Sequence, residues 1–159
     1  MKLKIETGPD NPILRKKSVK IVKFDKKLKK FLREMAEIML AKDGVGLAAP
    51  QVGVNERAVI LNLKIAPKKW QTVALVNPEI LDASLELICD EEGCLSLPGI
   101  FGEVERHATA TVRFWDENGT PRILELEGLN ARAIQHEIDH LDGILFTDRA
   151  SKVREAKAK

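Results

Sequence analysis

The sequence contains few of the residues that mark several large classes of protein. Among its 159 residues are only two cysteines, three histidines, five phenylalanines and two tryptophans, with no tyrosine. Two cysteines are too few for the disulfide framework of a small secreted scaffold, so we expect reduced thiols in a cytoplasm-like compartment. No apolar run approaches the roughly 18 residues that a membrane-spanning helix needs. The first residues also lack the apolar core and cleavage site of a secretory signal.

The composition that is present indicates one compact globular domain. The hydrophobic content is 44%, and 26 basic and 24 acidic residues give a net charge of +2. A chain of this length can bury a core without disulfides, and so small a net charge does not favour specific nucleic-acid binding. We expect a single domain over residues 1–159, ending in a short polar tail, 149–159, that forms a short or frayed helix.

Apolar periodicity predicts two long helices and several strands. A spacing of three and four residues predicts a helix from Asp25, as N-cap, to Lys42, and a second helix over 128–143. β-rich runs predict strands over 57–63, 72–80, 109–116 and 122–128, the last two joined by a hairpin near Asn118-Gly119. There are too few helices to cross over between parallel strands, so the pattern predicts an α+β fold with antiparallel sheet.

The first predicted helix carries a basic run on its outer face. Its members are Lys26, Lys27, Lys29, Lys30 and Arg33. We interpret this run as a solvated helix face. A non-enzymatic RNA- or ribosome-binding domain is the alternative, and the scarcity of aromatic side chains for base stacking argues against it.

The second predicted helix carries two of the three histidines. The segment "QHEIDHLDG" (135–143) places His136 and His140 four residues apart with Glu137 between them. Positions i and i+4 share one face of a helix, and this is the spacing of a metal-hydrolase helix. Neighbouring apolar residues predict that the helix is buried, and a divalent cation satisfies two buried imidazoles at once. The alternative is a pair of surface histidines beside an ordinary exposed acid.

A four-coordinate metal needs a third protein ligand. After His140 the chain has no histidine and a single glutamate, Glu155, so a zinc endopeptidase with a downstream ligand is a poor match. Upstream, "EEGCLSLPG" (91–99) offers Cys94 in a glycine-flanked turn, and thiolate binds zinc, iron and similar cations strongly. The other cysteine, Cys89, follows the apolar "LELI" and is predicted to be a small buried residue.

One thiolate and two imidazoles leave a coordination position open for water. Glu137 beside that position can take a proton from the water, which attacks a carbonyl carbon, and can pass the proton to a leaving amine. Attack on an amide creates an oxyanion that needs hydrogen-bond donors. Gln51 and the backbone around Leu95 are candidate donors if their two loops converge.

Three segments together resemble the motifs of peptide deformylases. They are "GVGLAAPQVG" (44–53), "EGCLS" (92–96) and "QHEIDHLDG" (135–143), in the family's order and separation. The resemblance extends to "DNPILRKKSVKIVKFDKKL" (10–28) and "VERHATATVRFWDENG" (104–119), and so to nearly the whole chain. It implies a hydrolase that removes the formyl group from the N-terminal methionine of newly made proteins. It also implies antiparallel sheets packed around a central helix that carries the histidines, with an N-terminal helix.

The resemblance implies roles for the matched catalytic residues. Cys94, His136 and His140 would hold one divalent metal, usually ferrous iron in this family, with zinc, nickel or cobalt in some members. Glu137 would be the general base and then the general acid. The Gln51 amide and the Leu95 backbone N–H would stabilise the oxyanion.

The resemblance also implies a substrate pocket and a biological setting. The pocket residues would be Val45, Gly46, Glu92 and Leu129, with Arg106 bracing Glu92. The chain departs from other members at three positions near this pocket, Asp90, Arg132 and Ala133, which puts the side-chain preference in doubt and leaves the chemistry unchanged. The expected partners are newly made formyl-Met polypeptides, met at the ribosome, with no membrane and no specific nucleic acid. The family precedent is a monomer of the bacterial cytoplasm; an organellar origin and an inactive family member stay open.

Overall fold

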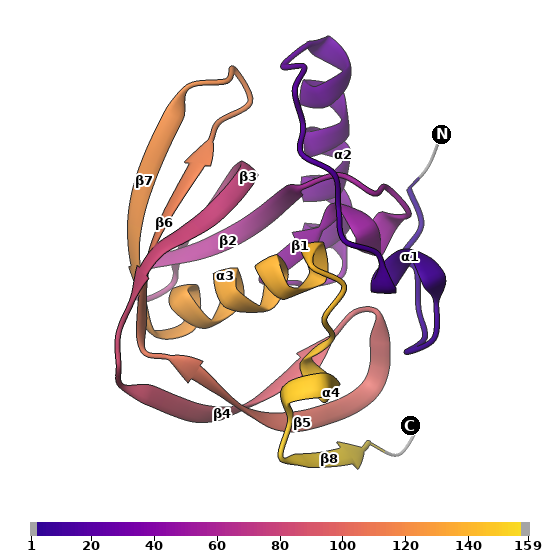
Figure 1. The fold of residues 1–159 in the computed structure, drawn as a ribbon, viewed down its shortest axis with the longest axis vertical. Coiled ribbons are helices and arrows are strands. Elements are labelled where there is room, and N and C mark those ends of the chain that lie inside the picture. The colour runs from indigo at the N-terminus through magenta and orange to yellow at the C-terminus, as the bar shows by residue number, and fades with distance from the viewer. Residues whose placement is uncertain (1–2, 157–159) are drawn as a thin grey trace.

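The computed structural model describes residues 3–156, which form two antiparallel sheets with a helix between them (Figure 1). The larger sheet has the order β1-β2-β3-β6-β7 and the smaller one β4-β5-β8. The strands are β1 (Gly46–Ala48), β2 (Ala58–Ala66), β3 (Lys69–Ala83), β4 (Leu87–Cys94), β5 (Leu97–His107), β6 (Thr109–Trp115), β7 (Pro121–Glu127) and β8 (Lys152–Glu155). The α-helices are α1 (Pro12–Arg15), α2 (Lys26–Ala41), α3 (Gly128–Leu141) and α4 (Phe146–Arg149), and a 3₁₀ turn spans Ala49–Val52. The predicted α+β fold with antiparallel sheets is confirmed.

The turn between β6 and β7 explains why the predicted hairpin forms. Gly119 has a φ of +80°, a conformation that costs glycine little. The Asp116 carboxylate accepts hydrogen bonds from the backbone N–H groups of Asn118 (2.9 Å) and Thr120 (3.0 Å). These contacts close the turn at the predicted position and set the pairing from Trp115–Pro121 to Thr109–Glu127.

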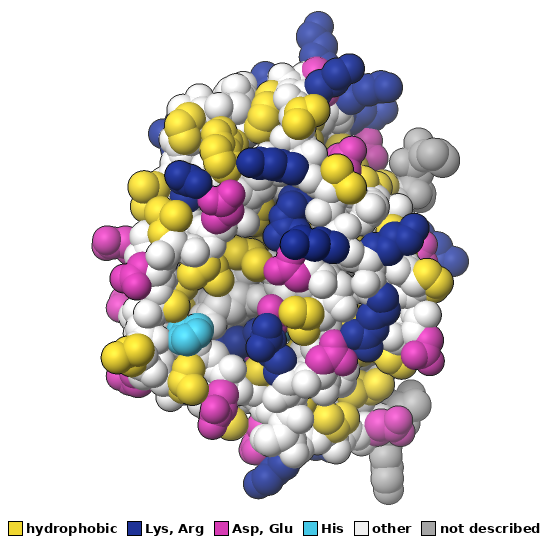
Figure 2. All heavy atoms as spheres, viewed as in Figure 1, with side chains coloured by type: hydrophobic (Ala, Val, Ile, Leu, Met, Phe, Trp, Pro, Cys, Tyr) yellow, Lys and Arg dark blue, Asp and Glu magenta, His cyan; other side chains and the backbone are white. Residues whose placement is uncertain are grey.

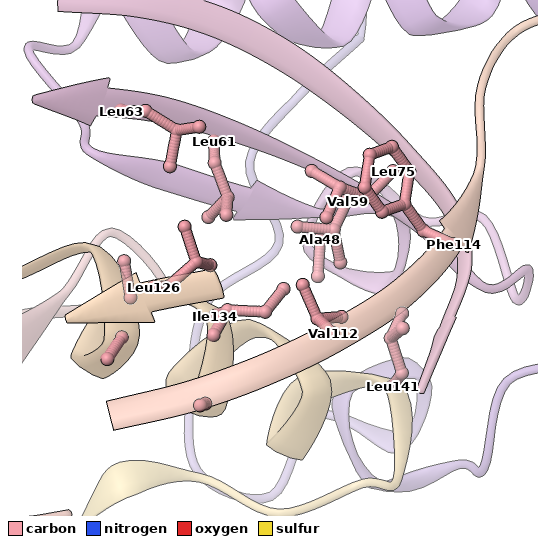
Figure 3. Close-up of a cluster of buried hydrophobic side chains, with 13 residues drawn as sticks. Ala48, Val59, Leu61, Leu63, Leu75, Val112, Phe114, Leu126, Ile134 and Leu141 are labelled. Atoms are coloured by element: carbon pink, nitrogen blue, oxygen red, sulfur yellow. The ribbon is translucent and has the colours of Figure 1, made fainter. Parts of the chain in front are cut away.

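The main core lies between the larger sheet and α3. Figure 3 shows Leu61, Leu75 and Val112 of the sheet pointing toward Ile134 and Leu141 of α3, and all five side chains are fully buried. Each buried aliphatic side chain of this kind contributes about 1.5–3 kcal/mol to folding. This packing fixes α3, and therefore its histidines, against a rigid sheet.

Helix α2 packs its apolar face on the same sheet from outside the main core. The Asp25 carboxylate accepts the backbone N–H of Leu28 at 3.0 Å, as a helix N-cap does. Four of its side chains are buried in a second cluster: Leu28, Leu32, Met35 and Met39. Lys and Arg side chains gather on the surface over the end of the molecule where α2 begins (Figure 2). No helix within residues 3–156 is long and apolar enough to cross a membrane.

The smaller sheet differs from the sequence-based expectations in three ways. Strands β4 and β5 were not predicted, because β4 is an edge strand with almost every side chain exposed and so has no alternation of apolar and polar residues. Cys89 lies on this strand and is exposed, so the prediction of a buried residue is wrong. The predicted short helix of the tail is also wrong, since Lys152–Glu155 pairs with β5 as strand β8. Residues 157–159 of the predicted tail lie outside the described residues.

Candidate active site

The three predicted metal ligands meet between α3 and the end of β4. His136 and His140 lie one turn apart on α3, and Cys94 ends β4 opposite them. The Nε2 atom of His140 is 3.3 Å from Cys94 Sγ and 3.2 Å from His136 Nε2. The three ligand atoms all lie within 4.8 Å of one another. The structure therefore brings together the three side chains that the sequence analysis selected from two distant segments.

The arrangement of these atoms fits a bound divalent cation. Nitrogen and sulfur ligands bonded at about 2.0–2.3 Å to a tetrahedral ion lie roughly 3.3–3.6 Å apart, close to the two distances found here. Burial disfavours a charged His136, but interactions with Glu137, Cys94 and Glu92 raise its pKa well above the usual value. Burial and the neighbouring His136 lower the pKa of His140, which keeps this imidazole in the neutral form that binds metal. Negative or electron-rich groups around His136 thus favour a positive charge at this position, which a bound cation would supply in place of the proton.

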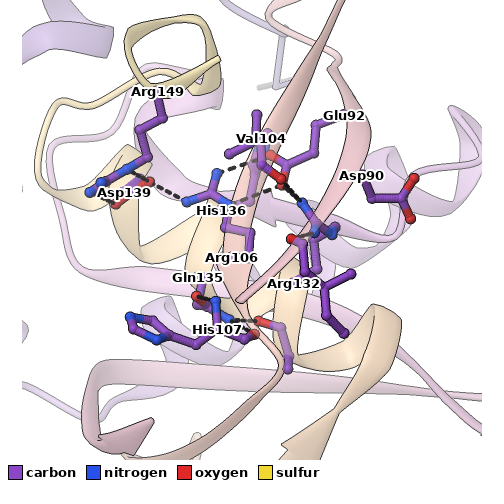
Figure 4. A network of polar contacts seen from close by, with 12 residues as sticks. Asp90, Glu92, Val104, Arg106, His107, Arg132, Gln135, His136, Asp139 and Arg149 are labelled. Carbon is purple, nitrogen blue, oxygen red and sulfur yellow. Dashed lines mark hydrogen bonds and ion pairs between the residues drawn. The ribbon is translucent and has the colours of Figure 1, made fainter. Parts of the chain in front are cut away.

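Glu92 orients His136 from the side opposite the cluster. Its carboxylate lies 2.8 Å from His136 Nδ1, which leaves Nε2 to face the other ligands. Arg106 donates two hydrogen bonds to the same carboxylate, both at 2.9 Å, and all three side chains are buried (Figure 4). Burial opposes ionisation of Glu92, but the hydrogen bonds from His136 and Arg106 hold its pKa well below the usual range. The bracing of Glu92 by Arg106 is thus present in the structure.

The network continues beyond the residues that the sequence indicated. Arg106 also donates to Asp139 at 2.6 Å, and Arg149 donates to both oxygens of Asp139 at 2.7 and 3.0 Å. Arg132, one turn before His136 on α3, donates to Glu92 at 2.6 Å. Positive and negative side chains therefore alternate through the network in Figure 4. Glu92 contacts Arg106 and Arg132, and Asp139 contacts Arg106 and Arg149.

Glu137 faces the same cavity as the ligand cluster and is almost fully buried, with 4% of its surface exposed. Burial raises its pKa to about 7, so its carboxyl can both accept and release a proton near neutral pH. Its Oε1 atom is buried and has no hydrogen-bond partner among the described residues. A carboxyl oxygen in this state is available to a substrate or a water molecule. A Cβ atom on Gly46 would lie 2.6 Å from the other carboxyl oxygen, so glycine is required there to make room.

Gln51 approaches the cluster from the opposite wall. Its Oε1 accepts the backbone N–H of Ala48 at 2.9 Å, which turns the amide NH₂ group toward the cluster. That group lies 3.2 Å from Ser96 Oγ and 3.5 Å from Cys94 Sγ. Ser96 fixes Gln51 and was missed by the sequence analysis. Leu95 stands between Cys94 and Ser96 in the turn from β4 to β5, so the loops of the two predicted donors do converge.

A cavity of about 310 Å³ opens onto these groups. The predicted residues in its lining are Val45, Gly46, Gln51, Glu92, Cys94, Leu95, Leu129, His136 and Glu137. Among the predicted metal ligands, oxyanion donors and pocket residues, His140 is the one absent from this lining, and 1% of it is exposed. Phe101 also lines the cavity and was missed, because it reaches the site through the unpredicted pairing of Gly93 with Phe101. Asp90, expected at the rim of this pocket, lines a neighbouring cavity instead.

Comparisons with known proteins agree with this site. The family model of polypeptide deformylases matches residues 2–156. A peptide deformylase of Thermotoga neapolitana is 48% identical over 139 residues, which cover 87% of this chain and 82% of that protein. The crystal structure of the Thermotoga maritima peptide deformylase has a TM-score of 0.88 at 43% identity. The match covers 96% of this chain and 99% of the Thermotoga maritima chain. A peptide deformylase of Acinetobacter baumannii with Met-Ala-Ser bound has a TM-score of 0.85 at 35% identity. The match covers 94% of this chain and 99% of that one. The chain therefore belongs to the polypeptide deformylase family, metal-dependent hydrolases that remove the N-formyl group from newly made proteins.

Proposed function

We propose that residues 1–159 form a single catalytic domain that hydrolyses the terminal formamide of formyl-Met polypeptides and releases formate. The observation that carries the proposal is the meeting of Cys94, His136 and His140 beside Glu137 in an open cavity. A formamide carbon bears only hydrogen as its second substituent. It can therefore reach a buried cluster that an internal peptide bond, flanked by two Cα atoms, reaches less easily.

The metal would be held by Cys94, His136 and His140. A thiolate with two imidazoles suits ferrous iron, our first choice, and also zinc, nickel or cobalt. When bound, the ion supplies Lewis-acid polarisation of the formyl oxygen and acidifies water. A thiolate ligand to ferrous iron makes the site sensitive to oxidation.

Glu137 would move the protons of the reaction. Its buried carboxylate would accept the proton of the attacking water and, as a carboxylic acid, return that proton to the departing amine. The Glu137 Oε1 atom, which has no hydrogen-bond partner within residues 3–156, is the natural acceptor. The released amine is the free N-terminus of the methionine.

The oxyanion would be stabilised by Gln51 and Leu95. The Gln51 NH₂ group is already turned toward the cluster through its fixed carbonyl oxygen. The backbone N–H of Leu95 follows directly after Cys94 in the same turn. Donors that are fixed before the reaction lower the barrier because no reorganisation is needed when charge develops.

The peptide would bind as an added strand between two sheet edges. β1 and β4 are edge strands of their sheets, and both border the cavity, through Gly46 and through Glu91–Cys94. An extended peptide can pair with such edges through its backbone, with little dependence on its later side chains. The first side chain would then enter the cavity beside Leu129, Val45 and Glu92. The Met-Ala-Ser tripeptide bound to the Acinetobacter baumannii relative is the kind of product that this arrangement would release.

The expected setting is the bacterial cytoplasm, where newly made formyl-Met polypeptides leave the ribosome. We expect the chain to act there as a monomer, without a membrane partner and without specific binding to nucleic acid. Membership of the family supports the substrate class.

The proposal is tested with protein purified without oxygen. Elemental analysis should find one divalent metal per chain, and formyl-Met-Ala-Ser should release formate while acetyl-Met-Ala-Ser should remain intact. Cleavage of unformylated internal peptide bonds without formate release would overturn the proposal in favour of an endopeptidase.

A further inference from the structure

The N-terminal segment, residues 3–8, contacts both loops that carry the proposed oxyanion donors. The backbone N–H of Glu6 donates to the carbonyl oxygen of Gln51 at 2.7 Å, and the backbone N–H of Gly8 donates to that of Ser96 at 3.0 Å. Gln51 lies in the 3₁₀ turn after β1, and Ser96 follows Leu95 in the turn from β4 to β5. One short stretch of backbone therefore joins two loops whose residues are 45 positions apart in the chain.

The two loops also contact each other directly. The Gln51 NH₂ group lies 3.2 Å from Ser96 Oγ, so both residues are joined to each other and to the N-terminal segment. Gln51 is 2% exposed and Ser96 is fully buried. Buried carbonyl oxygens need hydrogen-bond donors, and here the segment supplies them. We call this closed set of contacts among Glu6, Gly8, Gln51 and Ser96 the N-terminal bracket.

Asn11 ties the segment to helix α1, which follows it directly (Figure 1). The amide NH₂ group of Asn11 donates to Glu6 Oε2 at 3.3 Å and to the Thr7 carbonyl at 3.2 Å, while its Oδ1 atom caps the helix. At the other end of the segment, Leu3 and Ile5 pack against the apolar cluster that α2 buries. The segment is thus held on both sides of the bracket.

Gly8 is the position where the bracket depends on backbone conformation. Its φ is +105°, which glycine adopts freely and residues with a side chain rarely adopt. Apart from its chain neighbours, no atom within residues 3–156 would lie within 4 Å of a Cβ atom at this position. An alanine there meets no clash, so its effect comes from the change in backbone conformation, which turns the N–H away from Ser96.

We propose that the N-terminal bracket positions the oxyanion donors, with Glu6, Gly8 and Asn11 as positioning residues. By joining the two loops, it sets the distance between the Gln51 NH₂ group and the Leu95 backbone N–H before substrate binds. Donors that are fixed in advance stabilise developing charge without reorganisation, so the bracket acts on the transition state and not on the bound substrate. This inference rests on the proposed function, because that function assigns the oxyanion to these two donors.

Gly8→Ala and Asn11→Asp loosen the bracket by different routes. Gly8→Ala displaces the donor to Ser96, while Asn11→Asp keeps the acceptor that caps α1 and removes the two donors to the segment. Gly119→Ala is the control, since Gly119 has a φ of +80° and lies between β6 and β7, outside the lining of the active-site cavity. The values of kcat and KM for formyl-Met-Ala-Ser, the metal content and thermal unfolding are measured for each variant.

The two bracket variants should lower kcat by about tenfold, less than the roughly 10²–10³-fold that loss of a whole donor costs. KM and metal content should stay at the wild-type values, because the interaction is made in the transition state. Gly119→Ala should keep the wild-type kcat even if its melting temperature falls. An unchanged kcat in the bracket variants, a rise in KM without a fall in kcat, or a fall in kcat that follows metal loss would overturn the proposal. If Gly8→Ala does not fold, Asn11→Asp alone decides between these outcomes.

A combination with Gln51→Ala separates positioning from general destabilisation. Once the Gln51 amide is gone there is no pair of donors to align, so adding Gly8→Ala to Gln51→Ala should lower kcat by less than about twofold. A further tenfold fall would show that Gly8 acts elsewhere and would overturn the proposal. Absence of formate release by the metal-loaded wild type would instead refute the proposed function.

Discussion

Gly46→Ala should inactivate the site while leaving the metal ligands in place. The new Cβ atom would lie 2.6 Å from Glu137 Oε2 and 3.0 Å from Glu137 Cδ and Cγ. Non-bonded atoms prefer separations of about 3.5–4.0 Å, so the carboxyl group or strand β1 must move by roughly 0.5–1 Å. A displacement of about 1 Å at a catalytic group costs on the order of 100-fold in rate. Overpacking costs about 1–3 kcal/mol of stability, and the reduced freedom of the unfolded chain offsets about 0.4–1 kcal/mol of it.

The matched control is Gly44→Ala in the same segment. Its added Cβ would lie 3.2 Å from Met39 Cγ and 3.4 Å from both Leu95 Cδ1 and the Met39 carbonyl oxygen, so it needs a shift of only a few tenths of an ångström. Formate release from formyl-Met-Ala-Ser, metal content and thermal unfolding are measured for both variants. Gly46→Ala should lose activity and keep its metal, and Gly44→Ala should keep most of both. Full activity of Gly46→Ala, or equal losses in the two variants, would refute the placement of Glu137 against β1.

Three further outcomes are expected. Cys94→Ala should lose most of its metal in elemental analysis, and full occupancy would exclude the three-ligand site. Arg106→Met deprives the buried Glu92 and Asp139 of the arginine that they share. It should lower the free energy of unfolding in urea by about 3 kcal/mol, the low end for a broken buried ion pair, because each carboxylate keeps a second arginine. A negligible loss would contradict this network. Burial raises the pKa of Asp148, but its arginine partner and a backbone N–H lower it below the usual value. The stability difference between wild type and Asp148→Asn should therefore be present above a pH of about 3.9, the unfolded pKa, and disappear as the pH falls through the lower folded value. Melting curves that stay equally far apart at acid pH would show that another contact of Asp148 is responsible.

The elements that could be predicted are those whose side chains alternate between core and solvent. Helix α2 buries Leu28, Leu32, Met35 and Met39 at helical spacing, so its period is visible in the sequence. The β6–β7 hairpin is visible because Asn118-Gly119 has strong turn chemistry. The cluster of candidate metal ligands was predictable because His136 and His140 share a helix face and because further ligand residues are scarce after them.

The elements that escaped prediction depend on partners far away in the chain. Strand β4 is exposed along most of its length, and β8 is polar, so only pairing with β5 makes either of them a strand. The exposure of Cys89 follows from the same pairing. The position of the Arg132 guanidinium depends on hydrogen bonds to two backbone carbonyls of that sheet, at Ile88 and Val104, and no sequence pattern predicts such acceptors.

The most direct test is formate release by Glu137→Gln that has been loaded with metal without oxygen. Glutamine keeps the size of the side chain but cannot accept or return a proton at neutral pH. We predict full metal content and a fall in kcat/KM for formyl-Met-Ala-Ser of about 10²–10⁴, the usual contribution of general acid–base catalysis. Wild-type turnover by this variant would contradict the central claim that Glu137 moves the protons beside a Cys94, His136 and His140 metal site.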